Sequence, residues 1–215
     1  MRPIPDPLPD KDPIWEPDIL ALAIELVKEG LHGVSIQQLL SLTKVRIRAI
    51  YQSVHHTAAL SGPPIVGDAQ FYLNARNGKD RSGFEWNLQG ALFLHAYQSI
   101  QSAMDGYKVN RGWLLLNAYR AYRRWTRPLE PRKTPLLNIN QGYSLLRMSN
   151  LCNPGEFGEL ALTYCENCNR RYLVSLKHEL ITQVCPIEAM EDYHRRRTQR
   201  VITARKVSKT PRTRA

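Results

Sequence analysis

The chain has 215 residues, of which 43% are hydrophobic, and its formal net charge is +11. A chain of this length and composition has enough apolar residues to build the core of one sizeable domain. The absence of a run of about 18 apolar residues argues against a membrane-spanning helix. Four cysteines in a chain this long do not make a disulfide scaffold.

The N-terminal segment MRPIPDPLPDKDPIWEP (1–17) combines prolines with acidic residues. A signal peptide has a basic stretch followed by an apolar one, so we expect a cytoplasmic protein. Proline fixes φ and lacks a backbone N–H group, so the segment is predicted to be a disordered lead-in.

Three helices are predicted next. The first covers DILALAIELVKEG (18–30), with Asp18 as its N-cap and Gly30 as its end. A short helix starts at Ser35 and is broken at Ser41-Leu42, after which Thr43 caps a helix over 43–54. The apolar set expected in this third helix is Val45, Ile47, Ile50, Tyr51 and Val54.

Residues 35–54 therefore form a helix-turn-helix-like segment, and four polar side chains of its second helix are DNA-binding candidates: Lys44, Arg46, Arg48 and Gln52. Arg and Lys bond to guanine edges or phosphates, and Gln pairs with adenine. A solvated face in a helical bundle would give the same pattern, so both interpretations stay open.

The middle of the chain is predicted to be an α bundle. A connection rich in Gly and Pro (61–83) precedes it. The helices expected are 86–104, 110–125 and 134–149, with Asn110 and Thr134 as N-caps. Four aromatic residues at helical spacing are expected in the core: Trp113, Tyr119, Tyr122 and Trp125.

After residue 155 the sequence alternates like β-strands around a cysteine pair, and the spacing is Cys165-x2-Cys168-x16-Cys185-x2-Glu188. Three of the four positions match a zinc ribbon, whose structural metal needs four ligands. Glu188 stands at the fourth position, and His178 is an alternative ligand. Cys152 and His194 are further candidates for the fourth ligand, but they lie farther from the cluster in sequence. A metal-free ribbon with three thiols and a CxxC redox centre are the other interpretations.

The C-terminal segment from His194 to Ala215 has nine Lys or Arg residues and no acid, which leaves 21 basic and 19 acidic residues elsewhere. A basic arm suits a polyanion because each neutralised phosphate releases a counterion. A solvated tail that aids solubility is the alternative. Further DNA-binding candidates are Arg170 and Arg171 in the ribbon, and Arg195, Arg196 and Arg197 in the tail.

No Gly-rich phosphate loop, HExxH motif or GxSxG motif occurs, so we expect a protein that is not an enzyme. The predicted fold class is mainly α: a helical bundle with a helix-turn-helix-like segment and a small zinc-ribbon-like subdomain. The predicted division is a lead-in (1–17), a helical body (18–150), a cysteine-bearing ribbon (151–190) and a basic tail (191–215).

With these pieces placed, the chain resembles the family of the flagellar transcriptional regulator FlhC over about residues 18–190. The resemblance is carried by DILALAIELVKEG, SIQQLLSLTKVRIRAIYQSV, SGPP, WNLQGALFLHAYQSI, AYRAYRRW and CENC…CPIE, in this order and at this spacing.

The resemblance implies a cytoplasmic, DNA-binding activator of flagellar operons that acts in a hetero-hexamer with the partner FlhD and works with RNA polymerase at promoter DNA. It also implies a zinc site, in which Cys165, Cys168 and Cys185 take the first three ligand positions and Glu188 replaces the family's fourth cysteine. This departure is compatible with a diverged paralogue whose targets are not flagellar. A separate alternative is an interaction or scaffold subunit that assembles with a partner but reads no DNA sequence.

Overall fold

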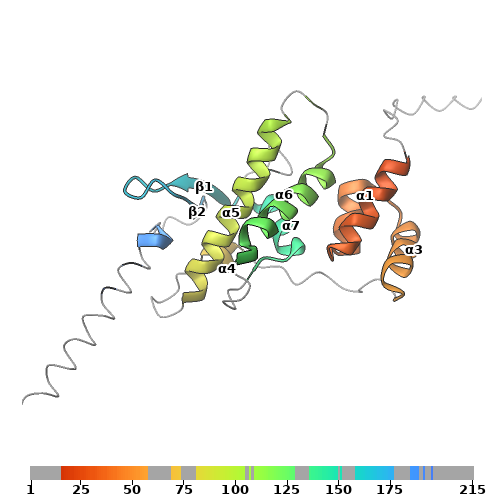
Figure 1. The fold of residues 1–215 in the computed structure, drawn as a ribbon, viewed down its shortest axis with the longest axis horizontal. Helices are drawn as coiled ribbons and strands as arrows, with labels where there is room; N and C mark the ends of the chain where they lie inside the picture. The colour runs from red at the N-terminus through yellow and green to blue at the C-terminus, as the bar shows by residue number, and fades with distance from the viewer. Residues whose placement is uncertain are drawn as a thin grey trace, which may run out of the picture.

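The computed structural model describes residues 16–57, 69–73, 81–104, 107, 109–128, 136–149, 151, 158–176, 185–188, 191 and 195. These ranges contain seven helices and one β-hairpin (Figure 1), so the described part of the chain is mainly α, as the sequence predicts. The elements are α1 (Glu16–Lys28), α2 (Gly33–Leu40), α3 (Lys44–His55), α4 (Ala69–Leu73), α5 (Arg81–Ala103), α6 (Arg111–Thr126), α7 (Ile139–Met148), β1 (Leu160–Tyr164) and β2 (Arg171–Ser175).

Helix α1 ends where the sequence predicts but begins earlier. Gly30 has φ of 86°. Its N–H donates to the carbonyl of Val27 at 2.9 Å, and the N–H of Leu31 donates to that of Leu26 at 2.9 Å. This pair of bonds is a Schellman motif, which favours glycine because of the positive φ. Asp18 lies inside the first turn of α1, so the prediction that it is the N-cap is wrong.

Helix α2 begins at Gly33, two residues before the predicted Ser35. Its N-cap is His32, whose Nδ1 accepts from the N–H of Val34 at 3.4 Å. The N–H of His32 itself donates to Oδ1 of Asn140 at 2.8 Å. A contact with a distant helix therefore sets this helix start, and local sequence does not reveal it.

Helix α3 follows the three-residue turn Ser41 to Thr43 and is capped by Thr43, as predicted. Ile47 and Ile50 are buried, but Val45 is 75% exposed, so its assignment to the apolar face is wrong. Successive helical residues are about 100° apart, which places Val45 opposite the buried pair. Tyr51 is also buried, and its hydroxyl donates to the carbonyl of Leu31.

The segment predicted as a long connection (61–83) contains the short helix α4, and α5 begins at Arg81 rather than at Trp86. Tyr72 of α4 is fully buried, and its hydroxyl donates to the carbonyl of Gln141 at 3.2 Å. The ring of Phe71 packs on that of Trp86 with centroids 4.7 Å apart. Tertiary packing of aromatic side chains thus supports a helix in a region rich in Gly and Pro.

Helix α6 has the predicted cap, since Oδ1 of Asn110 accepts from the N–H of Gly112 at 2.8 Å. Helix α7 does not begin at Thr134: its N-cap is Asn138, which forms a capping box with Gln141. Thr134 itself lies outside the described residues.

The aromatic set on α6 divides between core and surface. Tyr119 and Tyr122 are buried, as predicted. Trp113 and Trp125 are 41% and 46% exposed, so their assignment to the core is wrong. Trp125 lies at the margin of the contact with α5, where its ring centroid is 6.3 Å from that of His95, whereas Tyr122 meets the ring of Phe93 in the core with centroids 6.1 Å apart.

The first three helices are fastened to the bundle by polar contacts. The side chain of Asn140 donates to the carbonyl of Gly30 at 2.9 Å and accepts from the N–H of His32. Arg120 of α6 pairs with Glu25 at 2.5 Å and with Glu29 at 3.0 Å. These bonds position α3 through its packing on α1.

Strands β1 and β2 are antiparallel, with Leu160 opposite Ser175 and Tyr164 opposite Arg171. The hairpin is held on α5 by Asn87, whose amide both donates to the carbonyl of Leu173 and accepts from its N–H, each at 2.9 Å. Figure 1 shows α1 and α3 at one end of the described fold and the hairpin at the other. Among the helices of the described ranges, none combines the length and the apolar composition that crossing a bilayer requires.

Candidate metal centre and candidate nucleic-acid interface

The turn between β1 and β2 carries the first two cysteines. Cys165 follows β1, and the N–H of Asn169 donates to its carbonyl at 2.8 Å. The N–H of Cys165 in turn donates to the carbonyl of Arg170 at 2.9 Å. Asn169 has φ of 52°, a left-handed conformation that Asn adopts more readily than most residues. This tight turn brings both thiols to the same side of the hairpin.

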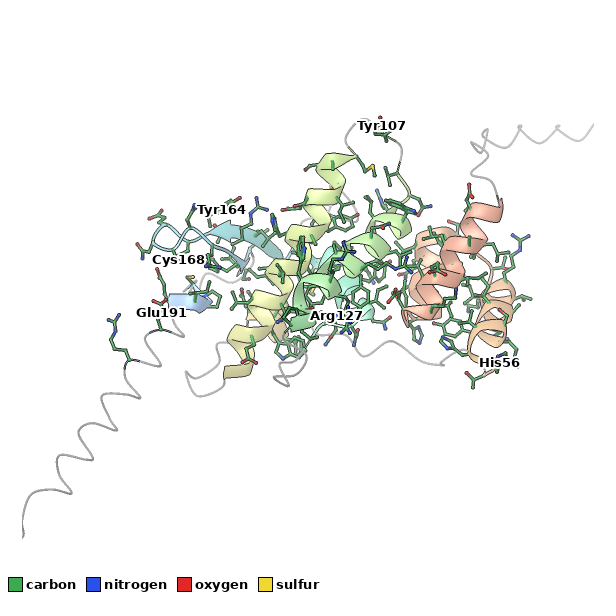
Figure 2. The ribbon with its side chains drawn as sticks, viewed as in Figure 1. His56, Tyr107, Arg127, Tyr164, Cys168 and Glu191 are labelled. Atoms are coloured by element: carbon green, nitrogen blue, oxygen red, sulfur yellow. The ribbon has the colours of Figure 1, made fainter. Side chains whose placement is uncertain are left out.

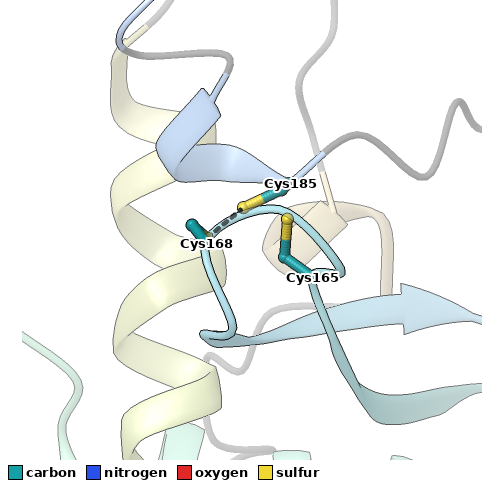
Figure 3. Close-up of side chains that lie close together, drawn as sticks. All are labelled: Cys165, Cys168 and Cys185. Atoms are coloured by element: carbon teal, nitrogen blue, oxygen red, sulfur yellow. Dashed lines mark hydrogen bonds between the residues drawn. The ribbon is translucent and has the colours of Figure 1, made fainter.

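Cys185 approaches the turn from a separate segment and completes a cluster of three thiols (Figure 3). The three Sγ atoms all lie within 4.8 Å of one another, and those of Cys168 and Cys185 are 3.6 Å apart. Cys165 and Cys185 are buried, while Cys168 is half-buried. The cluster can therefore bind a metal ion, and the proximity predicted from the spacing is confirmed for these three residues.

Glu188 also reaches the cluster. It lies in a single helical turn after Cys185, and its Oε1 accepts from the Sγ–H of Cys165 at 3.2 Å. The side chain at the fourth position of the spacing thus contacts Cys165, while the group of mutually close ligand atoms comprises the three thiols alone. Three sulfurs and one carboxylate oxygen suit a thiophilic divalent cation that binds four ligands. The alternative ligand His178 lies outside the described residues, as do Cys152 and His194.

The thiols differ in how readily they ionise. Burial raises the pKa of the Cys185 thiol to about 11, although backbone N–H groups of Glu188 and Ile187 act in the opposite direction. At Cys168 burial also acts to raise the pKa, but the backbone N–H of Arg170 and the neighbouring thiols outweigh it and lower the pKa below its ordinary value. Cys168 therefore deprotonates before Cys185, and a bound cation would be needed to ionise Cys185 at neutral pH.

The basic candidates of α3 are all on the surface. Lys44, Arg46, Arg48 and Gln52 are exposed, while the opposite side of the helix packs on α1 and α2. Nε2 of His55 donates to the carbonyl oxygen of Val27 in α1 at 3.1 Å. The residues of α2 and α3 include no Asp or Glu. This arrangement leaves one polar, positively charged helix face open to a partner.

The other predicted DNA contacts lie elsewhere. Arg170 is exposed in the hairpin, whereas Arg171 is half-buried and bonded to Tyr164, His95 and Gln98. Arg195 is exposed, and Arg196 and Arg197 lie outside the described residues. Figure 2 places Cys168 at one end of the fold and His56, which follows α3, at the other. The structure thus separates α3 from the hairpin arginines.

Sequence reasoning missed one polar site. His95 appears among apolar residues of α5, yet it faces the hairpin with Gln98 and receives a bond from Arg171. The signal available in the sequence is the spacing of four polar side chains along one helix face: His95, Gln98, Ser99 and Ser102. That spacing does not tell which element covers the face.

Comparison of the chain with protein-family models and with curated proteins finds no match in either set.

Proposed function

We propose that this chain is a DNA-binding transcription regulator, and not an enzyme, whose α2–turn–α3 unit acts as a helix-turn-helix. By the resemblance stated above, it is an FlhC-type activator of flagellar operons that forms a hetero-hexamer with an FlhD-like protein and acts with RNA polymerase at promoter DNA. An orphan regulator with other targets is the variant of this proposal that the replaced fourth cysteine favours.

The observation that carries the proposal is the division of α3 into two faces. One face buries Ile47, Ile50 and Tyr51 against the neighbouring helices, so the helix is rigidly held. The other presents Lys44, Arg48 and Gln52 to solvent, and the sequence has no acidic residue between Glu29 and Asp68. A helix that enters a DNA groove needs such a fixed, acid-free surface, because phosphates repel carboxylates.

Two apolar side chains on the same face support base reading. Val45 and Ala49 are exposed between the basic residues. An exposed valine gains nothing by burial in a face that meets only water, whereas against DNA it can contact the methyl group of thymine. Gln52 lies two turns after Val45 and would pair with adenine, while Lys44 and Arg48 would contact guanine or phosphate.

The cysteine cluster is proposed to hold Zn²⁺ through Cys165, Cys168, Cys185 and Glu188. A structural zinc ion supplies folding free energy by joining its ligands. Here it would fasten the segment 185–188 to the hairpin and so fix where the basic tail leaves the fold. Arg170 and the tail residues Arg195, Arg196 and Arg197 are proposed as additional phosphate contacts, since Arg170 and Arg195 are exposed.

Selection of bound duplexes from a random library with the full-length protein tests the proposal without knowledge of the targets. We expect an enriched sequence motif. Arg48→Ala should weaken binding to the selected duplex by about tenfold, and Gln52→Ala should relax preference at one position. Arg147→Ala removes an exposed arginine from α7 and serves as the control.

Equal affinity of Arg48→Ala and the wild type for the selected duplex would reject the role of α3. Failure to enrich any motif, with binding that depends only on charge, would reject the regulator itself.

A second candidate function is a protein-interaction subunit. It is favoured by an apolar cavity of about 360 Å³ where α1 meets the start of α6, lined by residues that include Ile19, Met104, Val109 and Trp113. Tyr107, labelled in Figure 2, lies at its rim and is 76% exposed. Truncation after Met190 separates the two functions: a body that loses all DNA affinity with the tail is a scaffold.

A further inference from the structure

A second, open cavity lies between α5 and the hairpin, at the other end of the fold from α3. Its volume is about 590 Å³, within the range of small-molecule sites. One wall is the polar face of α5, and the other includes Arg171 of β2. The lining includes His95, Gln98, Ser99, Ser102 and Arg171.

Arg171 is held in this cavity by neutral groups. Its Nε donates to the hydroxyl of Tyr164 at 2.6 Å, and its Nη1 lies 3.0 Å from Nδ1 of His95 and donates to Oε1 of Gln98 at 3.2 Å. The guanidinium carbon also lies 4.8 Å from the centroid of the Tyr164 ring. Within the described ranges no carboxylate pairs with Arg171. The positive charge is therefore oriented but not neutralised by these partners.

The neighbours of Arg171 are thereby made into hydrogen-bond donors. A guanidinium has no acceptor, so Nδ1 of His95 accepts its bond and the imidazole proton is on Nε2. Gln98 uses its oxygen toward Arg171, which leaves the amide nitrogen to donate. Burial, and next the charge of Arg171, lower the pKa of His95, so the ring stays neutral at neutral pH.

We infer that this cavity binds a small oxyanion, a carboxylate or phosphate, through Arg171, His95 and Gln98. Arg171 retains the two N–H groups of Nη2, and the hydroxyls of Ser99 and Ser102 line the same space. A half-buried arginine with pre-oriented donors and no acidic lining residue has the chemistry of an anion site. The lining also explains why two serines and two amide or imidazole side chains share one helix face.

The same chemistry has two sources: a free small anion, or a backbone phosphate of bound DNA. The free anion is favoured because Arg171 is recessed in a cavity, while the exposed residues of α3 lie at the other end of the fold (Figure 1). This inference goes beyond the proposed regulator and does not depend on DNA binding.

Equilibrium dialysis of radiolabelled inorganic phosphate against the full-length protein, at constant ionic strength, is the test. We expect saturable binding of one phosphate with Kd at or below about 1 mM. Arg171→Gln should weaken it by about tenfold or more. Lys28→Gln, which removes an exposed positive charge from α1, should leave it unchanged.

Arg171 also joins the hairpin to α5, so its substitution could reduce binding by disturbing the fold. A second pair of variants, which leaves Arg171 in place, separates these two effects. Ser102 is exposed at the rim of the cavity, so either charge is tolerated there by the fold. Ser102→Glu should abolish phosphate binding, and Ser102→Lys should retain or strengthen it. Equal binding by these two variants, or no saturable binding by the wild type, would overturn the inference.

Repeating the dialysis with a DNA duplex present distinguishes a free anion from a backbone phosphate of DNA as the natural ligand. Saturating DNA duplex should leave the bound phosphate in place if the ligand is a free anion. Displacement of phosphate by the duplex would overturn the assignment to a free anion and make Arg171 a DNA-backbone contact.

Discussion

Tyr122 is the residue on which three parts of the helical body depend. It is fully buried in α6, its hydroxyl donates to Oε1 of Gln89 at 2.7 Å, and it accepts from the N–H of Leu137 at 2.9 Å. It thereby joins α6 to α5 and to the extended residues before α7. A buried hydroxyl with both roles satisfied stabilises the core, because each partner would otherwise lose its hydrogen bond.

The ionisation of Tyr122 gives a pH prediction. Burial raises the pKa of Tyr122 to about 12, from the ordinary tyrosine value of 10.0. Above pH 10 the unfolded chain loses the proton first, so the free energy of unfolding should fall as pH rises from 10 toward 12. Its contribution is complete below pH 10, and the total loss is about 2 to 3 kcal/mol.

Urea unfolding of the wild type and of Tyr122→Phe over this pH range measures the effect. Phenylalanine cannot ionise, so the stability difference between the two proteins should shrink as pH rises. At neutral pH the variant should be less stable by about 1 to 3 kcal/mol, since Leu137 and Gln89 lose a partner. Taking the difference between the two free energies of unfolding cancels the ionisation of the other tyrosines, which both proteins share. Parallel pH profiles of the two proteins would contradict the prediction.

At the scale of elements, Asn87 holds the hairpin on α5. Its amide bonds to both backbone groups of Leu173, and these are the bonds that a neighbouring strand would otherwise make. Asn87→Ala should lower the free energy of unfolding by about 1 to 3 kcal/mol, because two buried backbone groups lose their partners. Asn117→Ala is the matched control, since that amide bonds only to the carbonyl of Trp113 on the surface. Equal stability of the two variants would exclude this role.

The thiol turn and the segment 185–188 meet at the proposed metal ligands and in a small apolar cluster that includes Tyr172, Val174 and Ile187. Glu188→Ala should weaken zinc binding by about tenfold or more, and Glu188→Cys should strengthen it, because a fourth thiolate replaces a carboxylate. Competition with a chromophoric chelator measures both, with Glu166→Ala, an exposed acid of the same turn, as the control. If Glu188→Ala bound zinc as tightly as the wild type, Glu188 would not be a ligand.

The elements that the sequence predicts well are those fixed locally. Gly30 ends a helix, and Thr43 and Asn110 each begin one, through bonds to residues at most three positions away. The turn at Cys165 brings its two thiols together through bonds that are also local. The start of α2 depends instead on Asn140, more than a hundred positions away. Such a partner leaves no trace in local spacing.

Other outcomes depend on which surface a neighbouring element covers. Trp125 and Tyr122 both lie in α6 and both fit the helical spacing of its aromatic residues. Tyr122 is buried against α5, while Trp125 is half exposed. The site residues show the same limit: the cysteine spacing predicts the thiol cluster, whereas the bonds of Arg171 with His95 and Gln98 require the hairpin to be placed on α5.

At the scale of the whole molecule, the proposed DNA contacts divide between two ends. Helix α3 lies at one end and the hairpin with Arg170 at the other (Figure 1). The elements between these two ends are joined by side-chain bonds, since Asn140 and Arg120 fasten the first three helices to α6 and α7. A duplex that contacts both ends must therefore extend along the molecule rather than fit into one groove.

This separation predicts how variants combine. Arg48→Ala and Arg170→Ala should reduce DNA affinity additively, because they share no contact or neighbour. Each should also lower the slope of log affinity against log salt by about 1 if its arginine contacts a phosphate. Shortening the selected duplex from one side should remove the effect of one variant and leave that of the other. If the two effects instead vanished together, both arginines would serve a single local contact, and the two-ended arrangement of DNA along the protein would be wrong.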